Sequence, residues 1–274
     1  MPVKLAESSH WYRCRQDSPE AAHDSDLRDA RKENLYPSPT SIDKQEFVNP
    51  ALDRYKITEL LEAASSNYKQ PHESIEQYEQ RLYDISVEKA KDAADFGKEV
   101  HDGIEHYPQM PLDPKLHPWI TQFGNWYDSE GFTTVCSEKI AVDHDLGVAG
   151  RLDRVVSKAG KLFLPDFKTQ GIRAKGKAGK KTPMYYESWP RQLSFYAVAY
   201  AKEVGMFPEI PDCMSVVIDS TEATPPYVKI WTKEEIASAY RQFVVACWRF
   251  FDKRDYWPAA NGKWGPPTFN IPML

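Results

Sequence analysis

The sequence lacks several patterns that mark particular classes of protein. No apolar run approaches the roughly 20 residues that a helix needs to cross a bilayer. The first segment, MPVKLAESSHWYRC, contains no apolar core of a secretory signal. No CxxC pair occurs, so a structural zinc site is not expected at Cys14, Cys136, Cys213 or Cys247. We therefore expect a cytoplasmic protein without a membrane segment, with reduced cysteines.

What is present is the composition of an ordinary folded protein with an uneven distribution of charge. The 274 residues are 41% hydrophobic and 27% charged, and the net charge is −5. Residues 168–191 nevertheless hold seven basic residues and one acidic residue, a net charge of +6. A basic patch on an acidic protein indicates a polyanionic partner. The residues predicted to contact DNA are Arg173, Lys175, Lys177, Lys180, Lys181 and Arg191.

Hydrophobic periodicity predicts a single domain with four regions. Residues 1–53 are predicted to be an irregular arm, 54–130 mainly helical, 131–257 a mixture of strands and helices, and 258–274 an irregular tail. Strands are predicted at 132–142, 147–157, 161–167, 214–219 and 227–231. Helices are predicted at 119–129, at 188–204, and from Thr232 to about 253. The fold class is therefore α/β, with a central mixed sheet of about five strands flanked by helices and an N-terminal helical part.

Two of the predicted strands bring acidic residues together. If Ala159-Gly160 is a two-residue turn, Asp153 lies opposite Asp166, with Cβ atoms about 5 Å apart on one face. Lys168 lies on that face too. A three-residue turn would offset this register. Adjacent carboxylates repel each other unless a cation lies between them, and their oxygens select Mg²⁺ or Mn²⁺.

Such a site suits phosphodiester hydrolysis. A metal ion activates water and neutralises charge on the phosphate, while the lysine orients that water or stabilises the transition state. A solvated cluster of surface charges explains the spacing equally well, because structural ion pairs imitate active sites.

The motifs around these residues resemble those of the PD-(D/E)XK nuclease superfamily. GRLDRV followed by LPDFKT is similar to its signature, with Asp153 as the first acid and residues 165–168 as the P-D-x-K element. Gln192 and Tyr196 resemble the Q-x-x-x-Y helix motif of the RecB/lambda-exonuclease-like branch, and FGKEVH resembles its G-x-x-x-H element, which carries a metal-ligand role onto His101. Glu138 matches an acidic position often found on the preceding strand.

The resemblance implies a restriction-endonuclease-like core and a set of site residues. The implied metal ligands are His101, Asp153, Asp166, the backbone carbonyl of Phe167 and, in addition, Glu138. The implied catalytic residues are Asp153, Asp166, Lys168, Gln192 and Tyr196. Each residue carried over from a motif also has an ordinary structural explanation: a solvated helix histidine, a helix-packing Gln–Tyr pair, and a strand-surface glutamate.

The expected function is a Mg²⁺- or Mn²⁺-dependent deoxyribonuclease, specifically an exonuclease of recombination, replication or repair. The alternatives are a site-specific endonuclease of the same superfamily and a non-catalytic DNA-binding protein on a nuclease scaffold. The expected partners are DNA and a single-strand annealing or recombination protein, and the oligomeric state is open. The segments HWYRC and YPSPTSI resemble phage-encoded members, which would place the protein in a bacterial host cell.

An iron–sulfur cluster is not expected. Relatives that hold one bring four cysteines, three of them clustered near the C-terminus. In this sequence only Cys213 and Cys247 lie in the C-terminal part, and they are far apart.

Overall fold

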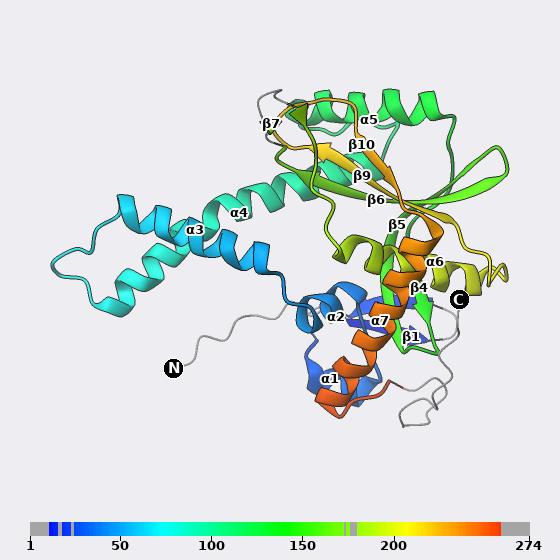
Figure 1. Ribbon diagram of the computed structural model, residues 1–274, viewed down its shortest axis with the longest axis horizontal. Helices are drawn as coiled ribbons and strands as arrows, with labels where there is room; N and C mark the ends of the chain where they lie inside the picture. Colours follow the sequence, from blue (N-terminus) through cyan, green and yellow to red (C-terminus); the bar gives the residue numbers. More distant parts are fainter. Residues whose placement is uncertain (1–10, 16–17, 23–24, 173, 176–179, 259–274) are drawn as a thin grey trace.

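A computed structural model describes residues 11–15, 18–22, 25–172, 174–175 and 180–258 (Figure 1). Its centre is a five-stranded sheet with the strand order β10-β9-β6-β5-β4. The strands are β4 (Thr133–Asp143), β5 (Val148–Lys158), β6 (Lys161–Gln170), β9 (Asp212–Asp219) and β10 (Tyr227–Ile230). Neighbouring strands are antiparallel except for β6 and β9, which are parallel. The five predicted strands and the mixed sheet are thereby confirmed.

Helices cover both faces of this sheet. On one face, α5 (His117–Glu130) and the end of α4 (Ile75–Glu105) pack on a cluster that includes Phe167 and Val216. On the other face, α6 (Ser188–Glu203) and α7 (Lys233–Arg254) pack on a cluster that includes Leu164 and Val217. Residues two apart along a strand face the same side, and here both sides are apolar because both are covered. The predicted α/β fold class is confirmed.

The chemistry of the chain explains where these helices begin. α7 starts at a capping box in which the Thr232 hydroxyl accepts from the Glu235 amide and the Glu235 carboxylate accepts from the Thr232 amide. The 31-residue α4 starts in the same way at Ser74 and Gln77. None of the helices in the described part of the chain combines the length and apolar character that a membrane crossing demands.

The N-terminal region differs from the prediction of an irregular arm. It contains a second sheet and two short helices: β1 (Trp11–Arg15), β2 (Ser18–Ala22), α1 (Leu27–Glu33), β3 (Tyr36–Pro37) and α2 (Pro39–Glu46). Trp11, Leu35 and Ile42 are buried in the cluster beneath α6 and α7. Burial against distant segments, which local periodicity does not reveal, orders this part of the chain. The predicted irregular tail lies outside the described residues from 259 onward.

An arm of two antiparallel helices extends away from the body of the protein (Figure 1). It consists of α3 (Pro50–Ser66) and the first half of α4. α4 continues from the arm to the sheet, so one helix of roughly 46 Å joins the two. The remaining elements are a 3₁₀ turn at Pro114–Leu116 and a short strand pair, β7 (Ala174–Lys175) and β8 (Lys180–Lys181).

Candidate active site

The β5–β6 hairpin turns as its sequence predicts. Ala159 and Gly160 both have positive φ, 49° and 76°, which is the geometry of a two-residue type I′ turn. The pairs Lys158↔Lys161, Ser157↔Leu162 and Val156↔Phe163 follow that register. Among the described residues the pairing ends there, so the predicted direct pairing of Asp153 with Asp166 is not formed. The two strands separate before they reach the acids.

Pro165 explains why the ladder opens. Backbone N–H groups two residues apart point to the same neighbouring strand, and the N–H of Phe167 points to β5, where it donates to Asp153 Oδ2 at 2.7 Å. The nitrogen of Pro165 therefore faces β5 as well, and it has no hydrogen to donate. On its other edge β6 stays paired with β9 as far as Gln170. A carboxylate thus takes the place of a backbone carbonyl at the opening.

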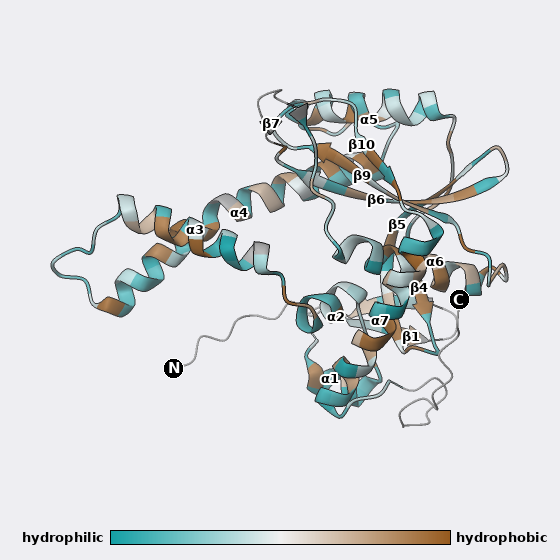
Figure 2. Cartoon of the chain, viewed as in Figure 1, coloured by the Kyte–Doolittle hydropathy of each residue, from teal (hydrophilic) through white to brown (hydrophobic). Residues whose placement is uncertain are grey.

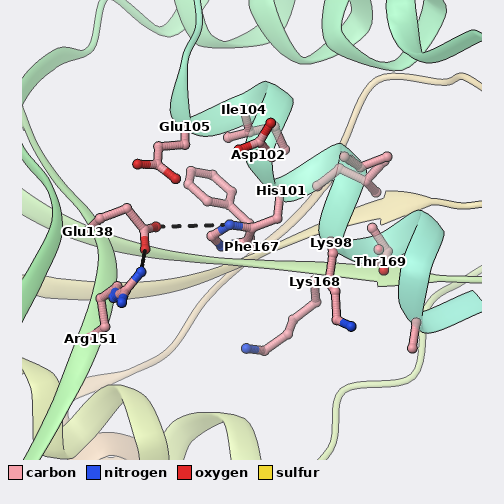
Figure 3. Close-up of a pocket in the computed structure, with 14 residues that line it drawn as sticks. Lys98, His101, Asp102, Ile104, Glu105, Glu138, Arg151, Phe167, Lys168 and Thr169 are labelled. Carbon is pink, nitrogen blue, oxygen red and sulfur yellow. Dashed lines mark ion pairs between the residues drawn. The ribbon is translucent and has the colours of Figure 1, made fainter. Parts of the chain in front are cut away.

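Three potential metal ligands meet at this opening, and each comes from a different element. His101, on α4, places Nε2 3.3 Å from Asp153 Oδ2 and Nδ1 3.9 Å from Glu138 Oε1. One ligand atom from each of His101, Glu138 and Asp153 lies within 4.8 Å of the others. Figure 3 shows the His101 ring and the Glu138 carboxylate turned toward each other. His101 is therefore no solvated helix residue, and Glu138 is no ordinary strand-surface glutamate.

The backbone at Glu138 is held in an unusual conformation. Its φ is +50° within β4, in the left-handed region that non-glycine residues rarely enter. The preceding part of the strand contains a register shift between Thr134 and Cys136. Conformations of this kind cost about 1–3 kcal/mol and cluster at functional sites. At this position the left-handed backbone conformation accompanies a carboxylate that faces His101.

Ionisation in this group follows from burial and charge. The interaction with Asp153 raises the pKa of His101. Burial, and then the negative charge of Asp153, raises the pKa of Glu138. Burial opposes ionisation of Asp153, but its contacts with His101, the charge of Lys168 and the Phe167 amide hold its pKa below the ordinary value. The group therefore holds one firmly ionised carboxylate beside a proton-binding imidazole.

Asp166 and Lys168 form the second half of the site. Asp166 is 2% exposed, and Lys168 Nζ lies 2.8 Å from both of its carboxylate oxygens. Burial raises the pKa of Asp166 to about 6 although the Lys168 ammonium lowers it. Among the described residues, the buried Asp166 Oδ2 has no hydrogen bond besides this ion-pair contact with Lys168. Asp166 is paired with Lys168 rather than with the three potential ligands.

Gln192 and Tyr196 support this ion pair from α6. Lys168 Nζ lies 3.5 Å from Gln192 Oε1, and Gln192 Nε2 lies 3.3 Å from the Tyr196 hydroxyl. Tyr196 is buried, so it supports Gln192 from inside the fold.

The donor set fits a divalent cation. Two carboxylates and an imidazole offer three ligand atoms within 4.8 Å of one another. Carboxylate oxygens suit Mg²⁺ and Mn²⁺. A cation would also offset the repulsion between acids held so close together. The carbonyl of Phe167 stays a predicted ligand.

The predicted DNA-binding residues have different surroundings. Arg173 and Lys177, and the side chains of Lys175 and Lys180, lie outside the described residues. Lys181 Nζ pairs with Asp219 Oδ2 at 3.2 Å and also with Glu222.

Arg191 does not fit the predicted contact with DNA. It is 5% exposed, its Nε donates to Asp43 Oδ1 at 2.5 Å, and its guanidinium stacks 3.8 Å from the centre of the Phe47 ring. A phosphate cannot reach a side chain in this position. The prediction of a DNA contact at Arg191 is therefore corrected to an internal ion pair.

Arg151 belongs to the site although the sequence analysis gave it no role. A hollow of about 510 Å³ lies over His101 and Glu138, and Lys98, Glu105 and Arg151 also line it (Figure 3). Arg151 is exposed and reaches Glu138 Oε2 at 3.5 Å. It precedes Asp153 by two residues on β5, and that spacing, which places both on one face, is the signal that would have identified it.

Arg154 fixes the end of α4 to the sheet. It is 2% exposed, and its Nη2 donates to the carbonyls of Ile104 and Glu105 at 2.8 and 3.1 Å. Its guanidinium also lies over the rings of Tyr127 and Phe167. The last carbonyls of a helix have no partner within the helix, so Arg154 supplies one and sets the position of His101 one turn earlier.

Comparison with known proteins agrees with this arrangement. Residues 120–230 match the family model described as PD-(D/E)XK nuclease superfamily. The match therefore covers less than half of the chain and shows a similarity to this superfamily. The matched segment runs from within α5 to the end of β10 and includes Glu138, Asp153, Asp166 and Lys168, whereas His101 and the arm lie outside it.

Other comparisons contribute less. A solved structure titled "Crystal structure of SSO0001" is similar at 12% sequence identity with a TM-score of 0.26, and the similarity covers 72% of this chain and 86% of that chain. No curated protein matches this chain significantly.

Proposed function

We propose that the protein is a divalent-metal-dependent nuclease that hydrolyses phosphodiester bonds of DNA. One observation carries the proposal: ligand atoms of His101, Glu138 and Asp153 converge within 4.8 Å where the β5–β6 ladder opens, next to the Asp166–Lys168 pair. Glu138 and Asp153 belong to the segment that matches the nuclease family model. Each of these residues also stands in a motif that resembles the superfamily signature.

The residues divide into a metal-binding group and a water-orienting group. His101, Glu138 and Asp153 would hold the ion, joined by Asp166 and the Phe167 carbonyl. When bound, the ion supplies positive charge for the cleaving phosphate and acidifies the attacking water. The Lys168 ammonium donates to that water and orients it. Gln192 holds Lys168, and the buried hydroxyl of Tyr196 holds Gln192.

The DNA backbone would lie along the hollow over His101 and Glu138. Arg151 and Lys98 line that hollow, and Arg151 is free to exchange its contact with Glu138 for one with a phosphate once a cation binds Glu138. The basic stretch 173–181 adds further phosphate contacts. Because such contacts release counterions, binding should weaken steeply as salt rises.

Exonuclease action is the mode that we propose. Its support is the resemblance of the His101 and Gln192–Tyr196 motifs to the RecB/lambda-exonuclease-like branch. We propose that this activity serves recombination, replication or repair. Mg²⁺ or Mn²⁺ is the proposed ion, because carboxylates dominate the donor set.

Cleavage of end-labelled linear DNA tests this proposal. The wild-type protein should release nucleotides from the labelled end in Mg²⁺ or Mn²⁺ and stop in EDTA, and Lys168→Ala should lower the rate by about 10²-fold or more. Lys161→Ala is the matched control, because Lys161 is an exposed lysine at the turn of the same hairpin. Equal rates for wild type and Lys168→Ala would contradict the site. Cleavage of closed circular DNA at defined positions would identify an endonuclease, and DNA binding without cleavage would identify a non-catalytic protein.

A further inference from the structure

The arm exposes an unusual amount of apolar surface. Eight of the seventeen large hydrophobic residues that are exposed in the described chain lie between residues 55 and 87: Tyr55, Ile57, Leu60, Leu61, Tyr68, Ile75, Tyr83 and Val87. Figure 2 shows apolar segments on both α3 and α4 where they extend away from the sheet. Contiguous apolar patches of this kind mark sites of association.

Most of these side chains lie on one face that both helices share. Directions round a helix advance by about 100° per residue. On α3, Ile57, Leu60 and Leu61 lie roughly 120° from the line through Ala63 that contacts α4. On α4, Tyr83 and Val87 lie roughly 120°, in the same sense, from the line through Leu82 that contacts α3, whereas Ile75 lies close to that line. Because the helices are antiparallel, equal rotations in one sense place both stripes on the same side.

The arm has little core of its own. Among the described side chains of residues 50–95, Ala63 and Leu82 are the buried hydrophobic ones. Two helices joined by so few buried contacts gain little from packing, and most helix stability in proteins comes from the packing of an apolar face. The exposed face is therefore a larger apolar surface than the contact between α3 and α4.

We propose that this shared face binds the same face of a second copy of the chain, so that two arms form an antiparallel four-helix bundle. The five side chains of the face, with Tyr68 at its tip, expose about 650 Å² if a fully exposed large side chain presents roughly 200 Å². A stable interface buries about 600–1,000 Å² on each partner. One arm therefore offers the area that a two-fold dimer needs.

The charges beside the face favour a second copy in antiparallel orientation. Near the tip, Glu76 and Glu79 project toward the face from the first turns of α4. Near the body, Lys91 and Arg54 lie at its border, together with Asp53. An antiparallel pair brings the acidic tip of each arm to the end of the partner that carries Lys91 and Arg54. Opposite charges at the border set register and orientation. The proposal does not depend on nuclease activity.

Sedimentation equilibrium of the full chain tests the proposal without DNA or metal. The wild-type protein should associate from 31.5 kDa to twice that mass as its concentration rises through the micromolar range. Leu61→Lys removes an apolar side chain from each partner and buries a charge, so the dissociation constant should rise by about hundredfold or more. Tyr83→Lys should act in the same way from the other helix.

Tyr55→Lys is the matched control, because Tyr55 is an exposed apolar residue of the arm on the opposite side of α3. It should dimerise like the wild type. Far-UV circular dichroism of all variants should agree, because each replaced side chain is exposed. A wild type that stays at 31.5 kDa overturns the proposal. So does a Leu61→Lys variant that associates as tightly as Tyr55→Lys, or a larger assembly that Leu61→Lys leaves unchanged.

Discussion

Glu138 combines an unfavourable backbone conformation with the position of a potential metal ligand. Its backbone has a φ of +50°, and burial together with the charge of Asp153 raises the pKa of its carboxyl. Glycine accepts this φ without strain, whereas alanine does not. Replacing Glu138 by each of these residues therefore separates the backbone cost from the role of the carboxylate.

We predict that Glu138→Gly is more stable to urea unfolding than Glu138→Ala by about 1 kcal/mol, although glycine normally destabilises a strand. Both variants should cleave DNA more slowly than the wild type, because both lose a potential metal ligand. The comparison needs urea unfolding curves and cleavage rates for the two variants. If Glu138→Ala proved the more stable, the positive φ would not carry the strain that we assign to it.

The sequence motifs selected residues that the fold brings together, but they did not give the geometry of the group. The turn at Ala159-Gly160 and the first pairs of the hairpin follow from local spacing, and that spacing suggested that Asp153 pairs with Asp166. Pro165 prevents this pairing, and the missing donor could have been read from the sequence. The internal partner of Arg191 could not, since Asp43 lies 148 positions away and only the folded chain brings them together.

At the scale of elements, the end of α4 depends on one buried cation. Arg154 donates to two carbonyls of the last turn and lies over two aromatic rings. We predict that Arg154→Ala destabilises the protein by about 3 kcal/mol, because two buried carbonyls lose their donor and a cavity opens. Its cleavage rate at saturating DNA should fall as well, because His101 lies on the same helix and would lose its position. Arg151→Ala, which removes an exposed arginine from the same strand, should leave stability almost unchanged.

Urea unfolding of both variants, followed by cleavage measured as kcat and KM, checks this prediction. Arg154→Ala should lower kcat, while Arg151→Ala should raise KM and reduce the dependence on salt. Equal stabilities for the two variants would mean that Arg154 does not hold the helix in place.

The end of β9 is tied to its surroundings through Asp219. Its carboxylate accepts from the Thr221 hydroxyl at 2.7 Å, from the Thr221 amide at 2.9 Å and from Lys181 at 3.2 Å. Burial opposes ionisation of Asp219, but these hydrogen bonds outweigh it and lower its pKa.

A folded-state pKa below the unfolded value means that the ionised carboxylate stabilises the fold. This contribution is complete above the ordinary aspartate pKa of about 3.9 and is lost as pH falls through the lowered value. We predict that Asp219→Asn lowers the free energy of unfolding at neutral pH, and that its difference from the wild type shrinks as pH falls below the ordinary aspartate pKa. Urea unfolding across this pH range measures the effect, and a constant difference between the two proteins would contradict it.

At the scale of the whole molecule, the proposed metal ion links elements that are far apart in the sequence. His101 comes from the helix that begins in the arm, while Glu138 and Asp153 come from two strands of the sheet. An ion that binds only the folded protein stabilises it by about 2.7 kcal/mol at a concentration one hundred times its dissociation constant.

We therefore predict that Mn²⁺ or Mg²⁺ raises the midpoint of thermal unfolding and that EDTA reverses the rise. The shift should disappear in His101→Ala and persist in Lys161→Ala. Calorimetry in the absence of DNA measures it directly. A shift of equal size in His101→Ala would exclude this imidazole from the metal site.

The overall architecture was predictable where the local sequence of an element shows its periodicity or its capping residues. The five strands, α5, α6 and the capped start of α7 all carry clear periodicity or capping residues. The N-terminal sheet does not, because β1 and β3 are short and gain their order from burial of Trp11 and Tyr36 beneath distant elements. Contacts across long stretches of chain are the part of the fold that local patterns leave out.

The hydrogen bond from the Phe167 amide to Asp153 gives the site its own spectroscopic probe. This amide proton points at a carboxylate that is proposed to bind metal, so its chemical shift should respond when a diamagnetic ion such as Mg²⁺ withdraws charge from that carboxylate. A nitrogen-15 spectrum of labelled protein would then follow occupancy of the site during a titration. Pro165 contributes no amide signal of its own. The resonance of Phe167 would therefore report on the part of the hairpin where strand pairing has ended and the site begins.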